Sequence, residues 1–128
     1  GICSIIPGVK GMSENIEAIS IVDKYLEHSR VYIFGNDGEP EVYISSADFM
    51  NRNLDSRVEV TCPIYDKNIQ KELIDNFDIG WKGNVKARIH SENLDNKYRI
   101  RGHKAVFRAQ LETYNYYRNN LEVITEKV

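Results

Sequence analysis

The chain has 128 residues and a mass of 14.8 kDa, so we expect one compact domain over residues 1–128. Hydrophobic residues make up 41% and charged residues 28%, a globular composition that excludes wholesale disorder. The net charge of −2 argues against a general polyanion-binding protein. No apolar run approaches the roughly 20 residues of a membrane span, and no secretory leader is visible. The chain starts with Gly1 rather than Met, so we expect a piece of a longer protein.

The N-terminal part predicts a short apolar strand over residues 1–7, closed by a turn at Pro7. Ser20 is followed three residues later by Asp23, which resembles a helix cap. We therefore expect a helix near residues 20–28.

The central part predicts a β-hairpin. Residues 30–34 and 41–45 are rich in β-formers, and residues 35–40 between them are dense in turn formers. A third strand is expected over residues 57–64. It contains Cys62, which we expect to be a buried small hydrophobe.

The C-terminal half predicts two helices, one with an apolar stripe between Asp66 and Gly80 and one over about residues 103–119. A short strand is expected at residues 85–89 between them. The alternation predicts an α/β fold, in which a mixed sheet has helices packed against it. Cys3 and Cys62 are too few for a disulfide framework and too isolated for a zinc site, which fits a reducing cytoplasm.

A basic segment runs from Lys97 to Arg108 without an acidic residue. Its members are Lys97, Arg99, Arg101, Lys104 and Arg108. Such a segment is either a solvated face or a surface that meets phosphate, and the residues alone leave both interpretations open.

The residues best suited to chemistry gather at one end of the predicted hairpin. His28 and Arg30 are two residues apart at the mouth of a strand, so they lie on the same side of the pleat. A guanidinium forks onto phosphate oxygens while an imidazole attacks, donates a proton or holds an oxygen. The second strand ends beside the start of the first and brings Ser45, Ser46 and Asp48 into the same region. Arg57 follows in a polar loop.

A structural interpretation of these residues competes with the chemical one. A lone histidine beside a strand is more often structural than catalytic, and Ser45-Ser46-Ala47-Asp48 is also a good helix cap. Neither explanation accounts for both features meeting at one end of a hairpin, so the two interpretations stay balanced at this point.

Several blocks follow one another along the chain in a specific order. They are Gly1-Ile2-Cys3-Ser4 through Pro7-Gly8, Gly11-Met12-Ser13-Glu14-Asn15-Ile16, Ser20-Ile21-Val22-Asp23-Lys24-Tyr25-Leu26-Glu27-His28-Ser29-Arg30, Tyr43-Ile44-Ser45-Ser46-Ala47-Asp48, Arg52-Asn53-Leu54-Asp55, Arg57-Val58-Glu59 and Arg108-Ala109-Gln110-Leu111. In these blocks the chain resembles the C-terminal catalytic domain of bacterial polyphosphate kinase, of the first type. The resemblance covers nearly the whole chain.

The resemblance implies a phospholipase D-like fold in which the last two domains each contribute half of one active site. It implies reversible transfer of the terminal phosphate of ATP to polyphosphate, through a phosphorylated histidine and with Mg²⁺. His28 matches the second active-site histidine, which contacts the nucleotide phosphates. The phosphate-carrying histidine, an arginine directly before Gly1 and a nucleotide-contacting tyrosine all belong to the part that precedes this chain. We therefore expect the isolated fragment to be inactive.

The implied partners are ATP or ADP, inorganic polyphosphate, the remaining domains of the same chain and further copies in a homo-oligomer, but not nucleic acid. Mg²⁺ is expected to be bound mainly outside this fragment, with no metal ligand within it. Phosphate-binding candidates are His28, Arg30, Ser45, Ser46, Asp48 and Arg57. Candidate polyphosphate contacts in the basic segment are Arg99, Arg101, Lys104 and Arg108.

Two departures from the pattern keep its chemistry. Phe49 stands where the family often has tryptophan, and Arg30 stands where phospholipase D-like enzymes have lysine, which retains the charge and adds a bidentate grip. A neutral His28 can stabilise an oxygen through Nε2–H, and a protonated one can neutralise leaving ADP or act as a general acid. His90 and His103 match no functional position and are expected at the surface. The alternatives are half of a phospholipase D-like phosphodiesterase or nuclease site, and a non-catalytic polyanion-binding module.

Overall fold

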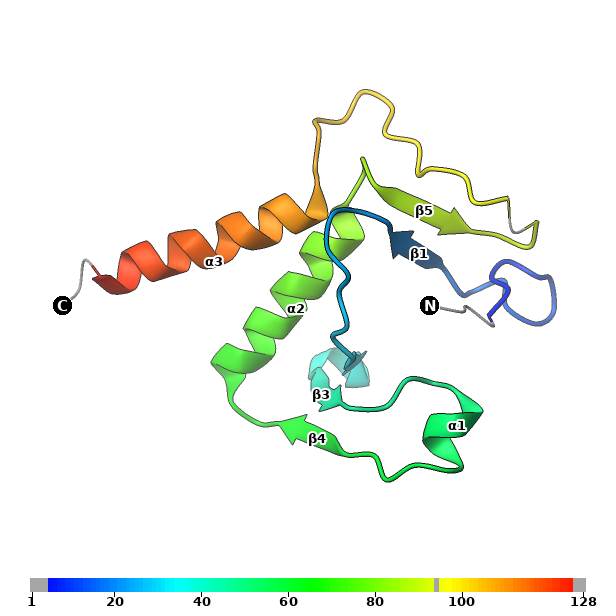
Figure 1. Cartoon of the computed structure of the whole chain (residues 1–128), viewed down its shortest axis with the longest axis horizontal. Helices are drawn as coiled ribbons and strands as arrows, with labels where there is room; N and C mark the ends of the chain where they lie inside the picture. Colours follow the sequence, from blue (N-terminus) through cyan, green and yellow to red (C-terminus); the bar gives the residue numbers. More distant parts are fainter. Residues whose placement is uncertain (1–4, 94, 126–128) are drawn as a thin grey trace. The chain divides into compact units, whose positions relative to one another are not determined.

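The computed structural model describes residues 5–93 and 95–125, which form short strands and helices (Figure 1). In chain order the elements are β1 (Ala18–Ile21), β2 (Val31–Phe34), the 3₁₀ turn η1 (Asn36–Gly38), β3 (Glu41–Ser45), α1 (Asn51–Leu54), β4 (Thr61–Ile64), α2 (Lys67–Lys82), β5 (Ala87–His90) and α3 (Ala109–Thr125). They divide into two compact units. One comprises residues 26–78, and the other comprises the residues up to Tyr25 together with those from Ile79 onward.

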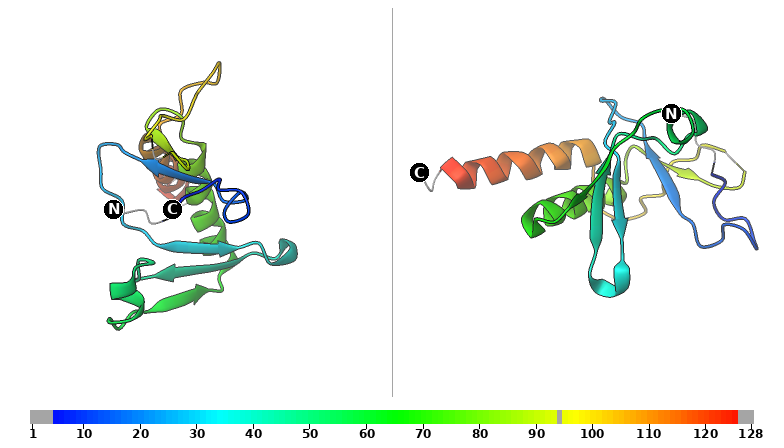
Figure 2. Two further views of the ribbon diagram at one scale, coloured as in Figure 1. Left: turned by 90° about the vertical axis from the view of Figure 1, so that its right-hand side faces the viewer. Right: turned by 90° about the horizontal axis from the view of Figure 1, so that it is seen from below.

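The predicted hairpin is confirmed in the unit of residues 26–78. β2 and β3 pair antiparallel with Val31 opposite Ile44, and the turn between them projects beyond the strands (Figure 2). Asn36 and Asp37 adopt positive φ angles of 41° and 52°, a conformation that asparagine and aspartate tolerate better than most residues. The turn chemistry that marked this hairpin in the sequence therefore also shapes it.

The third strand of this sheet is shorter than predicted. β4 covers only Thr61–Ile64 and pairs with β3 in the order β2-β3-β4, which makes β4 an edge strand. Cys62 is exposed on this edge, so the prediction that it is buried is wrong. The core position of the sheet is instead on the central strand, where Val42 is only 1% exposed.

α2 begins where the sequence predicted. The Asp66 carboxylate accepts hydrogen bonds from the backbone N–H groups of Asn68 and Ile69, at 2.8 and 3.1 Å, and so caps the helix. Gln70 is buried and donates from Nε2 to the Ile64 carbonyl at 2.6 Å, which joins the first turn of α2 to β4. Farther along, Ile74 and Phe77 line an apolar hollow that they share with β2 and Phe49.

The other unit contains a two-stranded antiparallel sheet of β1 and β5. β1 occupies part of the segment predicted as a helix over residues 20–28, and that prediction is wrong because strand pairing with β5 replaces helical hydrogen bonding. The Ser20 hydroxyl, expected to cap a helix, lies 2.5 Å from His90 Nε2 on the partner strand.

Two further predicted elements of this unit, a strand and a helix, are confirmed with shifted ends, whereas the predicted N-terminal strand is not found in its described residues. β5 corresponds to the strand expected at residues 85–89, and α3 corresponds to the helix expected at 103–119 but begins and ends six residues later. Of the strand predicted over residues 1–7, residues 1–4 lie outside the described part, and residues 5–7 form no strand. Both sheets of the described residues are antiparallel rather than mixed. No helix in the described ranges is long and apolar enough to cross a membrane.

Candidate functional site

Arg30, Asp48 and His28 form one polar cluster in the unit of residues 26–78. Arg30 donates from Nε to Asp48 Oδ1 at 2.6 Å, and its Nη2 lies 2.5 Å from His28 Nε2. His28 Nε2 is 3.8 Å from the same aspartate oxygen. The His28 side chain is 70% exposed, whereas that of Arg30 is 20% exposed. The cluster therefore has a fixed arginine at its base and an accessible imidazole.

Strand pairing brings these residues together as the sequence predicted. Arg30 directly precedes β2, and its carbonyl accepts a hydrogen bond from the Ser45 backbone N–H at 2.9 Å, at the end of β3. Asp48 follows three residues later, after a turn held by the Tyr32 hydroxyl, which donates to the Ala47 carbonyl at 3.1 Å. The antiparallel register thus places the end of one strand beside the start of the other.

The two serines of the turn contact the next strand segment instead of His28 or Arg30. Ser45 Oγ lies 2.9 Å from Thr61 Oγ1 and accepts from the Ala47 backbone N–H at 3.1 Å. Ser46 Oγ donates to Glu59 Oε2 and accepts from the Val60 backbone N–H at 3.0 Å. Their hydroxyls therefore shape the turn that carries Asp48.

Glu59 and Asn53 belong to this site, although neither was among the predicted site residues. Asn53 in α1 is 2% exposed and donates from Nδ2 to Glu59 Oε1 at 2.7 Å. Its Oδ1 is buried without a hydrogen-bond partner among the described residues. The signal available in the sequence was an acidic residue inside an otherwise apolar strand prediction, at residues 58–60.

Hydrogen bonds and nearby charges shift the pKa values of Asp48, Arg30 and Glu59 toward their charged forms. The hydrogen bond from Arg30 lowers the pKa of the Asp48 carboxyl, and the electrostatic influence of Arg30, His28 and Arg52 lowers it further. The same bond raises the pKa of Arg30. Hydrogen bonds from Ser46 and then Asn53 lower the pKa of Glu59, and the charges of Arg57 and Arg30 lower it further. Both carboxylates are therefore ionised at neutral pH.

Arg57 is exposed and has no side-chain hydrogen bond or ion pair among the described residues. The positive charge of Arg57 also lowers the pKa of Glu59, by less than the hydrogen bonds from Ser46 and Asn53 do. Its exposed guanidinium, close enough to Glu59 to affect that carboxylate, remains available to an anion.

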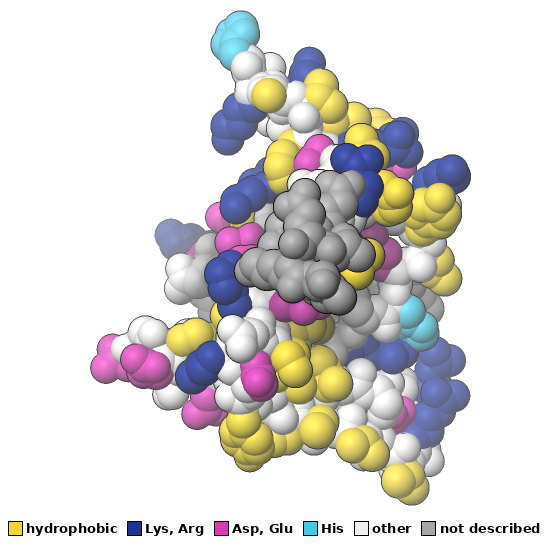
Figure 3. Space-filling model, turned by 90° about the vertical axis from the view of Figure 1, so that its left-hand side faces the viewer, with side chains coloured by type: hydrophobic (Ala, Val, Ile, Leu, Met, Phe, Trp, Pro, Cys, Tyr) yellow, Lys and Arg dark blue, Asp and Glu magenta, His cyan; other side chains and the backbone are white. Residues whose placement is uncertain are grey.

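The four candidate polyphosphate contacts lie in the other unit, where two of them are engaged. Arg108 donates from Nε and Nη2 to the Asp23 carboxylate, at 2.8 and 2.6 Å. Arg99 donates to the Trp81 carbonyl. Arg101 and Lys104 are exposed and have no side-chain partner in the described ranges. On the face shown in Figure 3, Lys and Arg side chains occupy several separate places among hydrophobic and acidic ones.

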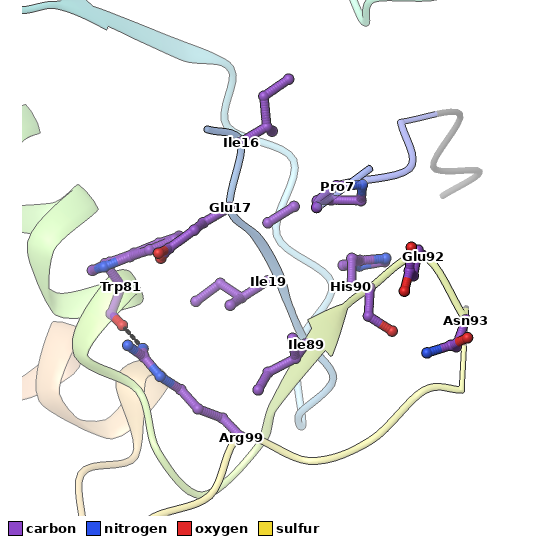
Figure 4. A pocket seen from close by; sticks show the side chains of 13 residues that line it. Pro7, Ile16, Glu17, Ile19, Trp81, Ile89, His90, Glu92, Asn93 and Arg99 are labelled. Atoms are coloured by element: carbon purple, nitrogen blue, oxygen red, sulfur yellow. Dashed lines mark hydrogen bonds between the residues drawn. The ribbon is translucent and has the colours of Figure 1, made fainter. Parts of the chain in front are cut away.

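A hollow of about 510 Å³ lies in this second unit. Its lining includes Ile19 and Ile89 of the two-stranded sheet, with Trp81 on one side and Arg99 below it (Figure 4). Glu17, His90 and Glu92 also line it, so its charge is mixed. Both His90 and His103 were predicted at the surface. His103 is exposed, as predicted, whereas His90 is half-buried in the lining of this hollow.

The described residues contain no group of three or more His, Cys, Asp or Glu side chains that could hold a metal ion. Asp48 is bound to Arg30, and both Glu59 oxygens accept hydrogen bonds from Ser46 and Asn53. Asp48 Oδ1 and both Glu59 oxygens are thus engaged by protein donors, and these two carboxylates supply fewer oxygen ligands than Mg²⁺ prefers.

Comparison with known proteins identifies close relatives. A family model described as "Polyphosphate kinase C-terminal domain 2" matches residues 1–110. The chain is 51% identical over 116 residues to the polyphosphate kinase of Escherichia coli, covering 91% of the chain and 17% of that protein. It is 47% identical over 119 residues to the polyphosphate kinase of Vibrio vulnificus, covering 93% of the chain and 17% of that protein.

A solved structure has the same arrangement. The crystal structure of polyphosphate kinase from Porphyromonas gingivalis superposes with a TM-score of 0.92 at 41% identity, covering 96% of this chain and 19% of that one. The chain thus spans about a fifth or less of the length of the relatives that it matches.

Proposed function

Since this chain belongs to the family of polyphosphate kinase C-terminal domains, we propose that it supplies part of an active site that transfers the terminal phosphate of ATP reversibly to polyphosphate. The observation that carries the proposal is the cluster of His28, Arg30 and Asp48, in which a fixed guanidinium lies beside an accessible imidazole. Phosphoryl transfer depends on positioning and charge neutralisation more than on covalent help from many side chains. We also propose that the fold is phospholipase D-like.

Arg30 is suited to hold a phosphoryl group because Asp48 fixes only part of its fork. Nε is bound to Asp48 Oδ1, which orients the guanidinium plane. The N–H groups that do not face Asp48 remain for non-bridging oxygens, and a guanidinium binds such oxygens in a bidentate manner. Arg57 is a second cation for the same anion, because its side chain is exposed and bears no partner among the described residues.

His28 would respond to an arriving phosphate. A guanidinium only donates, so the contact of 2.5 Å between Arg30 Nη2 and His28 Nε2 requires Nε2 to be the acceptor, with the proton of a neutral ring on Nδ1. When phosphate takes the Arg30 donor, Nε2 is released. It then stabilises a phosphate oxygen once it carries a proton, and as imidazolium it neutralises charge on the leaving nucleotide or protonates it.

The turn after β3 supports Arg30 and His28 indirectly in this proposal. Its serines, Ser45 and Ser46, shape the turn, and Asp48 holds Arg30. In the basic segment, the exposed Arg101 and Lys104 are the better candidates for a polyphosphate contact. Arg99 and Arg108 are engaged with Trp81 and Asp23.

The proposal assigns the other parts of the reaction to the remainder of a longer protein. A phosphorylated histidine, further ATP contacts and the ligands of Mg²⁺ are expected there, as the family resemblance implies. Homo-oligomer formation, a cytoplasmic location (with membrane association of the full-length enzyme as the alternative) and inactivity of the isolated chain remain predictions. Steady conversion of ATP to polyphosphate by these 128 residues alone would contradict the last of them.

The test compares the full-length parent enzyme with its His28→Ala variant, given ATP and Mg²⁺, by the amount of acid-insoluble polyphosphate formed. A loss of about 10²–10⁴-fold in a folded variant supports a role for His28 in phosphoryl transfer. His103→Ala is the matched control, because His103 is exposed and lies in the other unit. Equal activity of wild type and His28→Ala would remove His28 from the site. No polyphosphate from wild type would favour the phosphodiesterase or polyanion-binding alternatives.

A further inference from the structure

Glu59 is the common acceptor of two side chains that flank Asp48 in the sequence. Ser46, two residues before Asp48, donates its hydroxyl to Glu59 Oε2. Asn53, five residues after Asp48, donates from Nδ2 to Glu59 Oε1 at 2.7 Å. One carboxylate thus ties together both sides of the segment that carries Asp48.

The backbone around Glu59 reinforces this connection. The Ser46 backbone N–H donates to the Val60 carbonyl at 3.0 Å, and the Val60 backbone N–H donates to Ser46 Oγ at 3.0 Å. Ser46 is therefore held on three sides, by the Val60 N–H, the Val60 carbonyl and the Glu59 carboxylate. The residue after it, Ala47, is 6% exposed and accepts the hydrogen bond from Tyr32.

Burial makes the role of Glu59 hard to replace. Asn53 is 2% exposed, and its Oδ1 already has no partner among the described residues. Without Glu59 both polar ends of this buried amide would be unpaired, which is costly enough that α1 and the preceding turn would rearrange. Asp48 lies within that turn and orients Arg30.

We infer that Glu59 is a positioning residue, which sets the geometry of the phosphate-binding cluster by holding the Ser46–Asp48 turn against α1 so that Asp48 meets Arg30. This inference rests on the proposed function and deepens it. Glu59 has no hydrogen bond or ion pair with His28 or Arg30 among the described residues, and it acts through Ser46, Asn53 and Asp48. Displacement of a reacting group by about 1 Å costs up to about 10²-fold in rate.

A double-mutant cycle on the full-length parent enzyme tests the inference. Glu59→Ala should lower kcat/KM for ATP by about 10²-fold. In an Asp48→Asn background the same substitution should change kcat/KM by less than about threefold, because the two residues act in one chain of contacts. Glu39→Ala is the control, since Glu39 is an exposed glutamate of the hairpin turn outside this network. If Glu59 acts on stability alone, its effect on kcat/KM should be independent of Asp48, so the two fold-changes should multiply in the double variant, and this result would overturn the inference. Activity of Glu59→Ala within about twofold of wild type would also overturn it.

Two further measurements keep the inference separable from folding and from the proposed function. Glu59→Gln preserves size and one acceptor oxygen, so the same cycle applies to it if Glu59→Ala does not fold. A crystal structure of either variant should show the bond between Arg30 Nε and Asp48 Oδ1, 2.6 Å here, lengthened beyond hydrogen-bonding distance. An unchanged turn and bond would overturn the positioning role even if wild type makes polyphosphate. A displaced turn would support it even if wild type makes none.

Discussion

Asp23 and Arg108 are 85 residues apart in sequence and form a bidentate ion pair, with N–O distances of 2.8 and 2.6 Å. The Asp23 side chain is only 2% exposed, whereas that of Arg108 is 42% exposed. Next to the pair, Gln110 donates to the Tyr25 carbonyl at 2.7 Å and accepts from the Tyr25 backbone N–H at 3.0 Å. The segment after β1 is thereby fastened to the start of α3 within one unit.

Replacement of Arg108 should therefore destabilise the chain. Arg108→Ala leaves the Asp23 carboxylate buried without its counter-charge, and breaking such a pair from one side is strongly unfavourable. We expect a clear drop in Tm, with a smaller drop for Arg108→Lys, which keeps the charge and loses the fork. Arg101→Ala should leave Tm nearly unchanged, because Arg101 is exposed. Equal melting of Arg108→Ala and Arg101→Ala would contradict this.

The same pair predicts how stability depends on pH. The hydrogen bond from Arg108 lowers the pKa of Asp23 in the folded state. A depressed carboxyl pKa contributes stability that is complete above the unfolded pKa of about 3.9 and is lost as the pH falls through the folded pKa. Asp23→Asn should lower Tm at neutral pH and flatten the loss of stability below about pH 4. Thermal unfolding of wild type and Asp23→Asn across that range checks the slope of stability against pH. The slope of the variant should stay above zero, because the pKa values of Asp48 and Glu59 are also lowered.

Val42 should contribute strongly to the stability of the three-stranded sheet. It is 1% exposed on the central strand β3, so Val42→Ala removes buried apolar surface and leaves a cavity. We expect the free energy of unfolding to fall by about 2 kcal/mol. Val58→Ala is the control because Val58 is 99% exposed, and it should change stability by less than about 0.5 kcal/mol. Urea unfolding gives both values, and similar losses at the two positions would refute the assignment of the core.

Arg101 and Lys104 predict a salt-sensitive contribution to polyphosphate binding by the full-length parent. Each phosphate contact that is lost should reduce the slope of log affinity against log salt by about 1. Arg101→Ala combined with Lys104→Ala should therefore weaken binding most at low salt. Lys97→Ala should do less, because Lys97 is paired with Asp95 at 2.6 Å. If the Lys97 variant binds as weakly as the double variant, the exposed pair has no special role.

The sequence predicted the hairpin well because its information is local. Turn residues at 35–40 stand between two runs of β-formers, and η1 forms there, followed by β3, which pairs antiparallel with β2. The helix near residues 20–28 was wrong for the opposite reason. Ser20 and Asp23 match a helix cap locally, but β1 pairs with β5 almost 70 residues away, and that pairing decides the conformation.

The candidate site divides in the same way. The grouping of His28, Arg30 and Asp48 follows from strand direction alone, and the structure brings them together. The engagement of Arg108 by Asp23 could not be read from the basic segment, because the acidic partner lies 85 residues earlier. Cys62 was misjudged because its strand is apolar in sequence but lies at a sheet edge.

The sequence by itself determined the family, the hairpin, the main helices and the residues proposed to carry phosphate chemistry, because each depends on residue type and short spacing. Only the tertiary structure decided which of these groups are free and which are occupied. Glu59 and Asn53 enter the site, and Arg99 and Arg108 are engaged by the Trp81 carbonyl and the Asp23 carboxylate. The physical reason is that a hydrogen bond or ion pair depends on distance in space, and in this chain the partners that matter are brought close by strand pairing and packing.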